Sequence, residues 1–170
     1  MRLKKHPLPQ PGSLKFRKTL SMPALLQRIR EHFAKIPDHR RKRPVYSLVD
    51  TLMSAVALFS LKDENLLAFD DLRHEPIRQA NLRQLYGIAQ APCDTQMRTI
   101  LDQVDPHELR PAFVSLHQEL QKQGVLDTYR CLGKYLVSLD GTGLYSSSHV
   151  SCPDCCTKQH RNGETTYYHQ

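Results

Sequence analysis

Residues 47–61 read Ser-Leu-Val-Asp-Thr-Leu-Met-Ser-Ala-Val-Ala-Leu-Phe-Ser-Leu, and this stretch decides how the chain folds. As a helix it would be apolar over most of its circumference, through Leu48, Val49, Leu52, Met53, Ala55, Val56, Ala57, Leu58 and Phe59. A helix of this kind belongs in the middle of a bundle. The stretch is too short to span a bilayer, and Asp50 and the small polar residues also make it too polar.

Further helices are predicted before and after this stretch. A first helix begins near Pro23 with Ser21 as its cap, and Pro37 ends it. Shorter helices are expected over 65–72 and 75–86, with Gly87 as a stop. The buried stripe of the first helix is Leu25, Leu26, Ile29, Phe33 and Ile36.

Two more helices are predicted around a tight Asp105-Pro106 turn. The first is capped by Asp94 or Thr95, and the second is closed by Gly124. The pattern fits a helix-turn-helix or a plain helical hairpin, and the plain hairpin is favoured. The second helix has an apolar stripe at spacings of four, three and four, made by Leu109, Phe113, Leu116 and Leu120.

After Gly133 the pattern changes from helical to β-like. Residues 135–139 read as a short strand that ends at Asp140, and Leu144-Tyr145 starts a return strand. The predicted organisation is a flexible basic leader over 1–20, a helical domain over 21–130 and a β-containing domain over 131–170.

Basic residues concentrate at the front of a chain whose formal net charge is +7. Up to Tyr46 only Glu31 and Asp38 oppose them, whereas beyond it the acids outnumber Lys and Arg. This distribution indicates a polyanion partner, most often nucleic acid; a solvated tail is the other interpretation. The run expected to contact phosphates comprises Arg40, Arg41, Lys42 and Arg43.

Three of the five cysteines cluster in Cys152-Pro153-Asp154-Cys155-Cys156. An odd count without an export signal argues against a disulfide framework and favours a cytosolic protein. A C-x2-C spacing can present two thiolates to one zinc ion, which two histidines can complete. The sequence thus predicts a structural Zn²⁺ site, with unliganded reduced thiols as the alternative; its ligands would be Cys152, Cys155, His160 and His169.

Asp140 follows an apolar strand and precedes Gly-Thr-Gly, where backbone crowding is small. A metal ion or phosphate can approach a carboxylate placed there. An aspartate at a strand end also serves as a turn residue that bonds its own backbone. Spacing alone leaves both interpretations open.

Several blocks of residues 30–170 resemble the IS4-like group of bacterial insertion-sequence transposases. In the helical part these blocks are Asp38-His39-Arg40, Tyr46-Ser47-Leu48, 52–55, 59–62, 81–82, 85–88, 94–98 and 100–102. In the last part they are 139–143, Ser147, Cys152, Cys155, His160, Asn162-Gly163 and 168–170. Each block is weakly specific by itself, and together they are specific.

The resemblance implies a DDE enzyme, whose RNase H-like core holds three acidic residues and divalent metal, usually Mg²⁺. Such enzymes cut element ends and join the freed 3′-hydroxyl to target DNA. Asp140 matches the first acidic position, which implies a catalytic metal ligand. The helical part would bind the terminal inverted repeats of the element, in a cytoplasmic, nucleoid-associated protein that is a homodimer at full length.

The chain departs from this family's pattern after Asp140. The pattern requires a second Asp and a Glu further downstream, and the sequence ends at Gln170. The expected fold is therefore a mainly α N-terminal helical domain followed by the truncated start of an α/β RNase H-like domain. The alternative function is a small stand-alone DNA-binding or zinc-binding module without catalytic activity.

We expect this polypeptide alone neither to cleave nor to join DNA, because one carboxylate cannot assemble a two-metal site. The measurement is a nuclease assay on duplex element ends with Mg²⁺ or Mn²⁺. Specific end cleavage that disappears in the Asp140→Asn variant would contradict this expectation.

Overall fold

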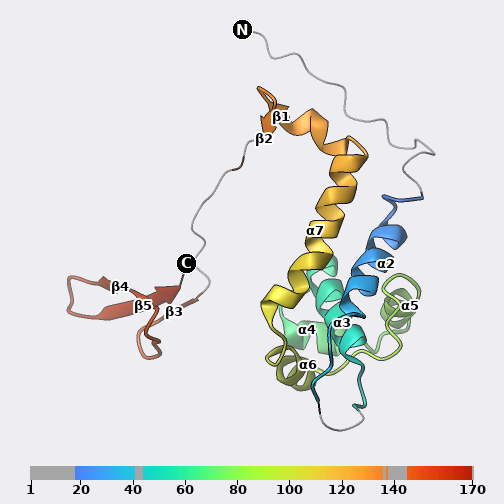
Figure 1. The fold of residues 1–170 in the computed structure, drawn as a ribbon. Coiled ribbons are helices and arrows are strands. Elements are labelled where there is room, and N and C mark those ends of the chain that lie inside the picture. Colours follow the sequence, from blue (N-terminus) through green and yellow to red (C-terminus); the bar gives the residue numbers. More distant parts are fainter. Residues whose placement is uncertain (1–17, 41–43, 136, 138–144, 170) are drawn as a thin grey trace. The chain divides into compact units, whose positions relative to one another are not determined.

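The computed structural model describes residues 18–40, 44–135, 137 and 145–169 (Figure 1). The chain divides into two compact units, residues 1–128 and residues 129–170. The described part of the first unit is helical, and that of the second contains two small antiparallel sheets. The predicted order along the chain, a helical region followed by β-structure, is thus confirmed. Within the described residues, no helix is both long and apolar enough to cross a membrane.

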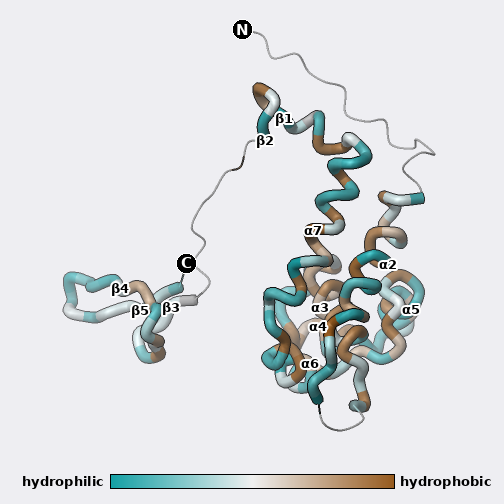
Figure 2. The backbone as a smooth tube through the Cα atoms, in the orientation of Figure 1, coloured by the Kyte–Doolittle hydropathy of each residue, from teal (hydrophilic) through white to brown (hydrophobic). Residues whose placement is uncertain are grey.

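Helix α3 (Leu48–Leu61) is the centre of the helical unit, as its sequence predicts. Ser47 caps it by accepting a hydrogen bond from the Asp50 amide at 3.0 Å, and Lys62 ends it in the left-handed conformation. The Met53 and Ala57 side chains are fully buried. The apolar colour of α3 in Figure 2 therefore corresponds to a helix enclosed by its neighbours over most of its length.

Helix α2 (Met22–Phe33) packs against α3 and α7 (Pro106–Lys122). Ser21 caps it, with the Ala24 amide donating to the Ser21 hydroxyl at 3.4 Å. The predicted stripe of this helix is confirmed for four of its five residues, because Leu26, Ile29 and Phe33 are buried and Ile36 packs against the same core. Leu25, the fifth, is only partly buried.

Helices α4 (Leu66–Leu72) and α5 (Pro76–Gln84) form where the sequence predicts them. Each contributes one buried apolar side chain, Phe69 from α4 and Leu82 from α5. Gly87 follows α5 with a φ of 67°, a conformation that favours glycine, so the predicted stop is confirmed.

Helix α6 (Asp94–Leu101) begins differently from the prediction. Neither Asp94 nor Thr95 is its N-cap; the capping position is Cys93, which makes no side-chain hydrogen bond there. The Asp94 amide donates instead to the Asp70 carboxylate of α4 at 3.2 Å. A carboxylate from another helix therefore satisfies one of the open donors at this terminus, which local sequence cannot reveal.

Helix α7 begins as predicted, because the Asp105 carboxylate accepts a hydrogen bond from the His107 amide at 2.9 Å. Its predicted apolar stripe is wrong in part. Ala112 and Glu119 are the buried residues of α7, whereas Phe113 is 53% exposed. Arg28 of α2 donates to the Glu119 carboxylate at 3.3 Å, so an ion pair contributes to the contact between α2 and α7.

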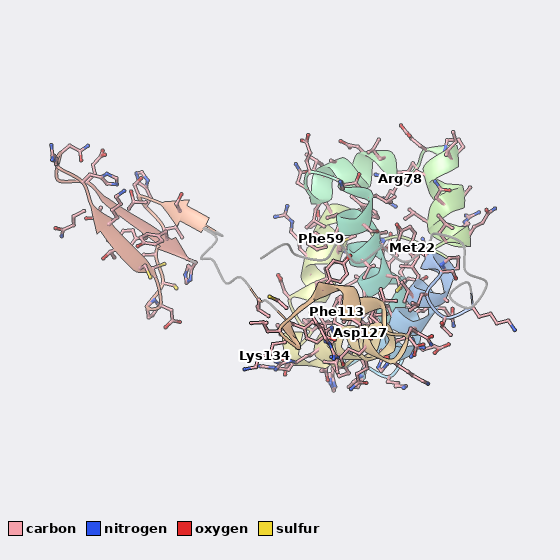
Figure 3. The ribbon with its side chains drawn as sticks, turned by 90° about the horizontal axis from the view of Figure 1, so that it is seen from above. Met22, Phe59, Arg78, Phe113, Asp127 and Lys134 are labelled. Carbon is pink, nitrogen blue, oxygen red and sulfur yellow. The ribbon has the colours of Figure 1, made fainter. Side chains whose placement is uncertain are left out.

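Phe113 and Phe59 line an apolar hollow of about 650 Å³ in the helical unit. Both rings are labelled in Figure 3, one on α7 and the other on α3. Phe59 is 80% exposed, so the last turn of α3 is not enclosed like its middle. Phe59 and Phe113, which the sequence pattern placed on the apolar faces of their helices, thus lie outside the closed core.

The second unit is β-structured. A short hairpin pairs β1 (Arg130–Cys131) with β2 (Lys134–Tyr135). Of the predicted strand over 135–139, residues 136, 138 and 139 lie outside the described residues. A separate antiparallel sheet has the order β3-β5-β4. Its strands are β3 (Tyr145–Ser147), β4 (Cys156–Gln159) and β5 (Thr165–His169).

The Asp50 carboxylate lies inside the helical unit, with the residue 5% exposed. One of its oxygens accepts from the Arg30 guanidinium of α2 at 3.1 Å. The other accepts from the Ala89 and Gln90 amides at 3.1 and 3.3 Å. The carboxylate thus joins α2, α3 and the segment after α5.

We expect Asp50→Ala to lower the free energy of unfolding of the helical unit by about 2–4 kcal/mol. The decrease arises because a guanidinium and two amides are left without their acceptor. Urea unfolding followed by helical circular dichroism measures it. Asp71→Ala, which removes an exposed carboxylate from α4, is the control. Equal decreases in the two variants would contradict the role given to Asp50.

Candidate metal centre and candidate nucleic-acid interface

The Cys152–Cys155 segment forms a tight turn before β4. The Cys155 amide donates to the Cys152 carbonyl oxygen at 3.1 Å, which closes the turn. The Cys152 amide donates to the Cys155 sulfur at 3.2 Å. The two sulfurs lie 3.7 Å apart as a result. All five cysteines are unpaired thiols, so this proximity involves no disulfide.

His169 reaches the two cysteines because of the strand register. Cys156 is paired with Tyr168 in the β4–β5 ladder, which places Cys155 beside His169 at the end of the sheet. The His169 Nε2 atom lies 3.0 Å from the Cys152 sulfur and 3.2 Å from the Cys155 sulfur. Three of the four predicted metal ligands are therefore brought together.

His160, the fourth predicted ligand, lies at the opposite end of the β4–β5 hairpin. Its amide donates to the Glu164 carbonyl at 2.8 Å in the turn, and its Nε2 atom lies 2.9 Å from the Thr166 hydroxyl. At about 3.3 Å per residue, the length of β4 separates His160 from Cys155 by roughly 15 Å. The structure therefore does not place His160 with the other three side chains, although its sequence spacing suggested it.

A second group of ligand-type atoms comprises Asp70, Cys93 and Asp94. Both Asp70 oxygens are already used, one by the Arg73 guanidinium and one by the Asp94 amide. The hydrogen bond from Arg73 is the main reason that the pKa of Asp70 is lowered. This group therefore stabilises the start of α6 and needs no metal ion.

Arg40 is the one member of the predicted phosphate-binding run that lies within the described residues. Its guanidinium donates two hydrogen bonds to the Asp38 carboxylate at 2.8 and 2.6 Å, and a third to the Tyr46 carbonyl at 3.0 Å. Arg40 therefore ties together the two ends of the basic turn. Arg41, Lys42 and Arg43 lie outside the described residues.

An open groove of about 830 Å³ adjoins this turn. One wall is formed by His39, Arg40 and residues 44–46, which flank the basic run on both sides. The other wall comes from α6 and the residues after it. Its exposed polar side chains follow one helical face at spacings of three and four: Gln96, Thr99 and Gln103.

Gln96 is the polar side chain of this wall for which the structure gives no internal hydrogen bond. The Thr99 hydroxyl donates to the Thr95 carbonyl at 2.9 Å, and the Gln103 amide group donates to the Thr99 carbonyl at 3.1 Å. The predicted site residues did not include this wall. The recurrence of Gln and Thr on the exposed face of α6 was the signal that could have found it.

Asp140, the predicted catalytic residue and ligand of Mg²⁺, lies outside the described residues. No protein-family model, curated protein or solved structure matches this chain. The transposase function and its metal requirement therefore stay predictions that depend on the sequence resemblance.

We expect the pKa of Asp38 to rise toward its ordinary value of about 3.9 in an Arg40→Gln variant. In the native chain the Arg40 hydrogen bonds lower this pKa, against the opposing effect of burial. The ion pair therefore stabilises the turn above the unfolded pKa of Asp38, and this contribution is lost as the pH falls through the lowered folded value.

An NMR titration of the Asp38 carboxyl carbon measures the effect. Lys35→Gln removes a positive charge three residues before Asp38 in the sequence, without removing a hydrogen bond to Asp38, and serves as the control. An equal change of the Asp38 pKa in the two variants would show that general charge, and not the Arg40 pair, lowers it.

Proposed function

We propose that this chain is the DNA-binding part of a DDE-type transposase and binds the ends of a mobile element through its helical unit. The observation that carries the proposal is the groove between the basic turn and the polar face of α6. There His39, Arg40 and residues 44–46, which precede and follow the basic run in the sequence, line a groove together with exposed Gln and Thr side chains of α6. Phosphates and base edges of one duplex require these two kinds of group.

The basic turn would supply affinity. Lys and Arg side chains that neutralise phosphates release counterions, which makes binding strongly dependent on salt and nearly independent of sequence. Because Arg40 is paired with Asp38 and Tyr46, we assign the phosphate contacts mainly to Arg41, Lys42 and Arg43. Arg40 then has a positioning role, since it holds the ends of the turn in place.

The α6 wall would supply sequence preference. A glutamine can form two hydrogen bonds with the major-groove edge of adenine, and a threonine can contact either kind of base pair. Gln96 is the residue that we expect to read a base, because Thr99 and Gln103 bond the helix backbone. The hydrogen bond from the Asp94 amide to the Asp70 carboxylate attaches the start of this helix to α4.

The resemblance assigns a different role to Asp140. As the first acidic residue of a DDE set it would hold a divalent metal ion, together with two acidic residues that the described structure does not contain. An RNase H-like core for the last part of the chain is part of the same proposal. The small antiparallel sheets of the second unit are compatible with it and do not distinguish it from other β-containing folds.

We expect replacement of Arg41, Lys42 and Arg43 by Gln to weaken binding to all duplexes alike. The slope of log affinity against log salt should become shallower by about 0.9 for each phosphate that is no longer neutralised. Fluorescence anisotropy on an inverted-repeat end and on a random duplex, at several salt concentrations, measures both quantities. Gln96→Ala should instead reduce the preference for the end sequence and leave the slope unchanged.

The matched control replaces three exposed cations elsewhere in the helical unit, Arg83, Arg110 and Lys122, by Gln. Both triple variants lower the net charge of +7 by three. Equal weakening would show that overall charge, and not the turn, attracts DNA. Failure of the unaltered chain to bind any duplex at low salt would contradict the proposed function.

A stand-alone DNA-binding or zinc-binding module is the second candidate function, and the grouped Cys152, Cys155 and His169 side chains favour its zinc-binding form. Preference for an inverted-repeat end distinguishes the candidates, because only transposase ancestry accounts for it. Binding to end and random DNA with equal affinity would favour the stand-alone module.

A further inference from the structure

We propose that Cys152, Cys155 and His169 bind one Zn²⁺ ion, and that this ion holds together the β3-β5-β4 sheet. This role is separate from DNA binding by the helical unit. The proposal depends on the distances between the three side chains, on their chemistry and on the burial of the sheet.

The distances agree with tetrahedral coordination. Two sulfurs that each lie about 2.3 Å from a tetrahedral zinc ion are about 3.8 Å apart. The Cys152 and Cys155 sulfurs lie 3.7 Å apart. A sulfur and an imidazole nitrogen on the same ion are about 3.6 Å apart. The His169 Nε2 distances of 3.0 and 3.2 Å are slightly shorter, so a small displacement of the ring admits the ion.

The ligand chemistry selects zinc. Two thiolates and one imidazole suit Zn²⁺, whereas Mg²⁺ and Ca²⁺ prefer oxygen ligands. The Cys152 amide that donates to the Cys155 sulfur at 3.2 Å can stabilise a thiolate there and fix its direction. The turn therefore presents both sulfurs to one point before any ion is bound.

The sheet has no hydrophobic core of its own among its described residues, so another interaction must stabilise it. Among residues 146–169, none is buried. All four residues of β4 are exposed, and β5 is only partly covered. The compact unit that contains this sheet, residues 129–170, is close to the size of about 40 residues below which disulfides, metals or association are generally required for folding. With all cysteines unpaired, a metal ion is the means of stabilisation that these side chains can provide.

The position of the site explains how one ion stabilises the sheet. Cys152 and Cys155 lie in the turn before β4, and His169 is the last residue of β5. An ion bound to all three therefore joins the open end of the β4–β5 hairpin, while the turn at Gly163 closes the other end. The described residues add no fourth ligand to this cluster. Water or a donor outside them fills that position.

The test is zinc binding by the whole chain, measured by native mass spectrometry and by competition with a chromogenic chelator. We expect one Zn²⁺ per chain. Cys152→Ser, Cys155→Ser and His169→Gln should each weaken zinc binding more than about a hundredfold, since removal of the residues that support metal ligands already weakens binding by roughly 10–100-fold.

The chain contains matched controls for both ligand types. Cys156→Ser removes a thiol next to Cys155, and His160→Gln removes the histidine at the far end of the same hairpin. Neither variant should change zinc affinity. Failure of the unaltered reduced chain to bind zinc, or an equal decrease in a control and a ligand variant, would overturn the proposal.

Two further measurements do not depend on how well a variant folds. Replacement of zinc by Co²⁺ in the unaltered chain should give sulfur-to-cobalt charge-transfer absorption, and its absence would overturn thiolate coordination. In ¹⁵N–¹H spectra, a chelator should shift the amide signals of residues 145–169 to unfolded positions and leave those of the helical unit in place. A sheet that is unchanged by the chelator would overturn the stabilising role of the ion.

Discussion

The buried carboxylate of Asp50 connects three parts of the helical unit. Helix α3 is apolar over most of its surface, and apolar packing alone tolerates many rotations of a helix within a bundle. The buried carboxylate restricts the rotation of α3, because it must accept hydrogen bonds from Arg30 and from the Ala89 and Gln90 amides. We infer that this requirement selects one arrangement of α2, α3 and the segment that leads to α6.

The proposed DNA-binding surface depends on the same use of carboxylates. Asp70 accepts a hydrogen bond from the first amide of α6, and Asp38 holds Arg40 across the base of the basic turn. These hydrogen bonds position both walls of the groove without occupying the exposed Gln96 side chain. Asp38 and Asp70 thus position the two sides of the surface that we propose binds DNA.

The two units differ in how much apolar surface they bury. The helical unit buries a continuous apolar cluster around α3, whereas residues 146–169 of the second unit include no buried residue. Hydrophobic burial is proportional to the area removed from water, so it contributes little to so small a sheet. Metal coordination by Cys152, Cys155 and His169 does not require such an area, and it would make folding of the sheet depend on zinc.

Most helix positions could be predicted from local sequence, because the period of the apolar residues, the helix starts at Ser21, Ser47 and Asp105 and the stop at Gly87 act within a few residues. The C-x2-C turn could be identified in the same way. Three features required the tertiary structure: Asp70 supplies the hydrogen bond at the start of α6, Glu119 of α7 pairs with Arg28 of α2, and His169 and not His160 joins the cysteines. These outcomes follow from helix packing and strand register, which bring together residues that are distant in sequence and leave no signal in local spacing.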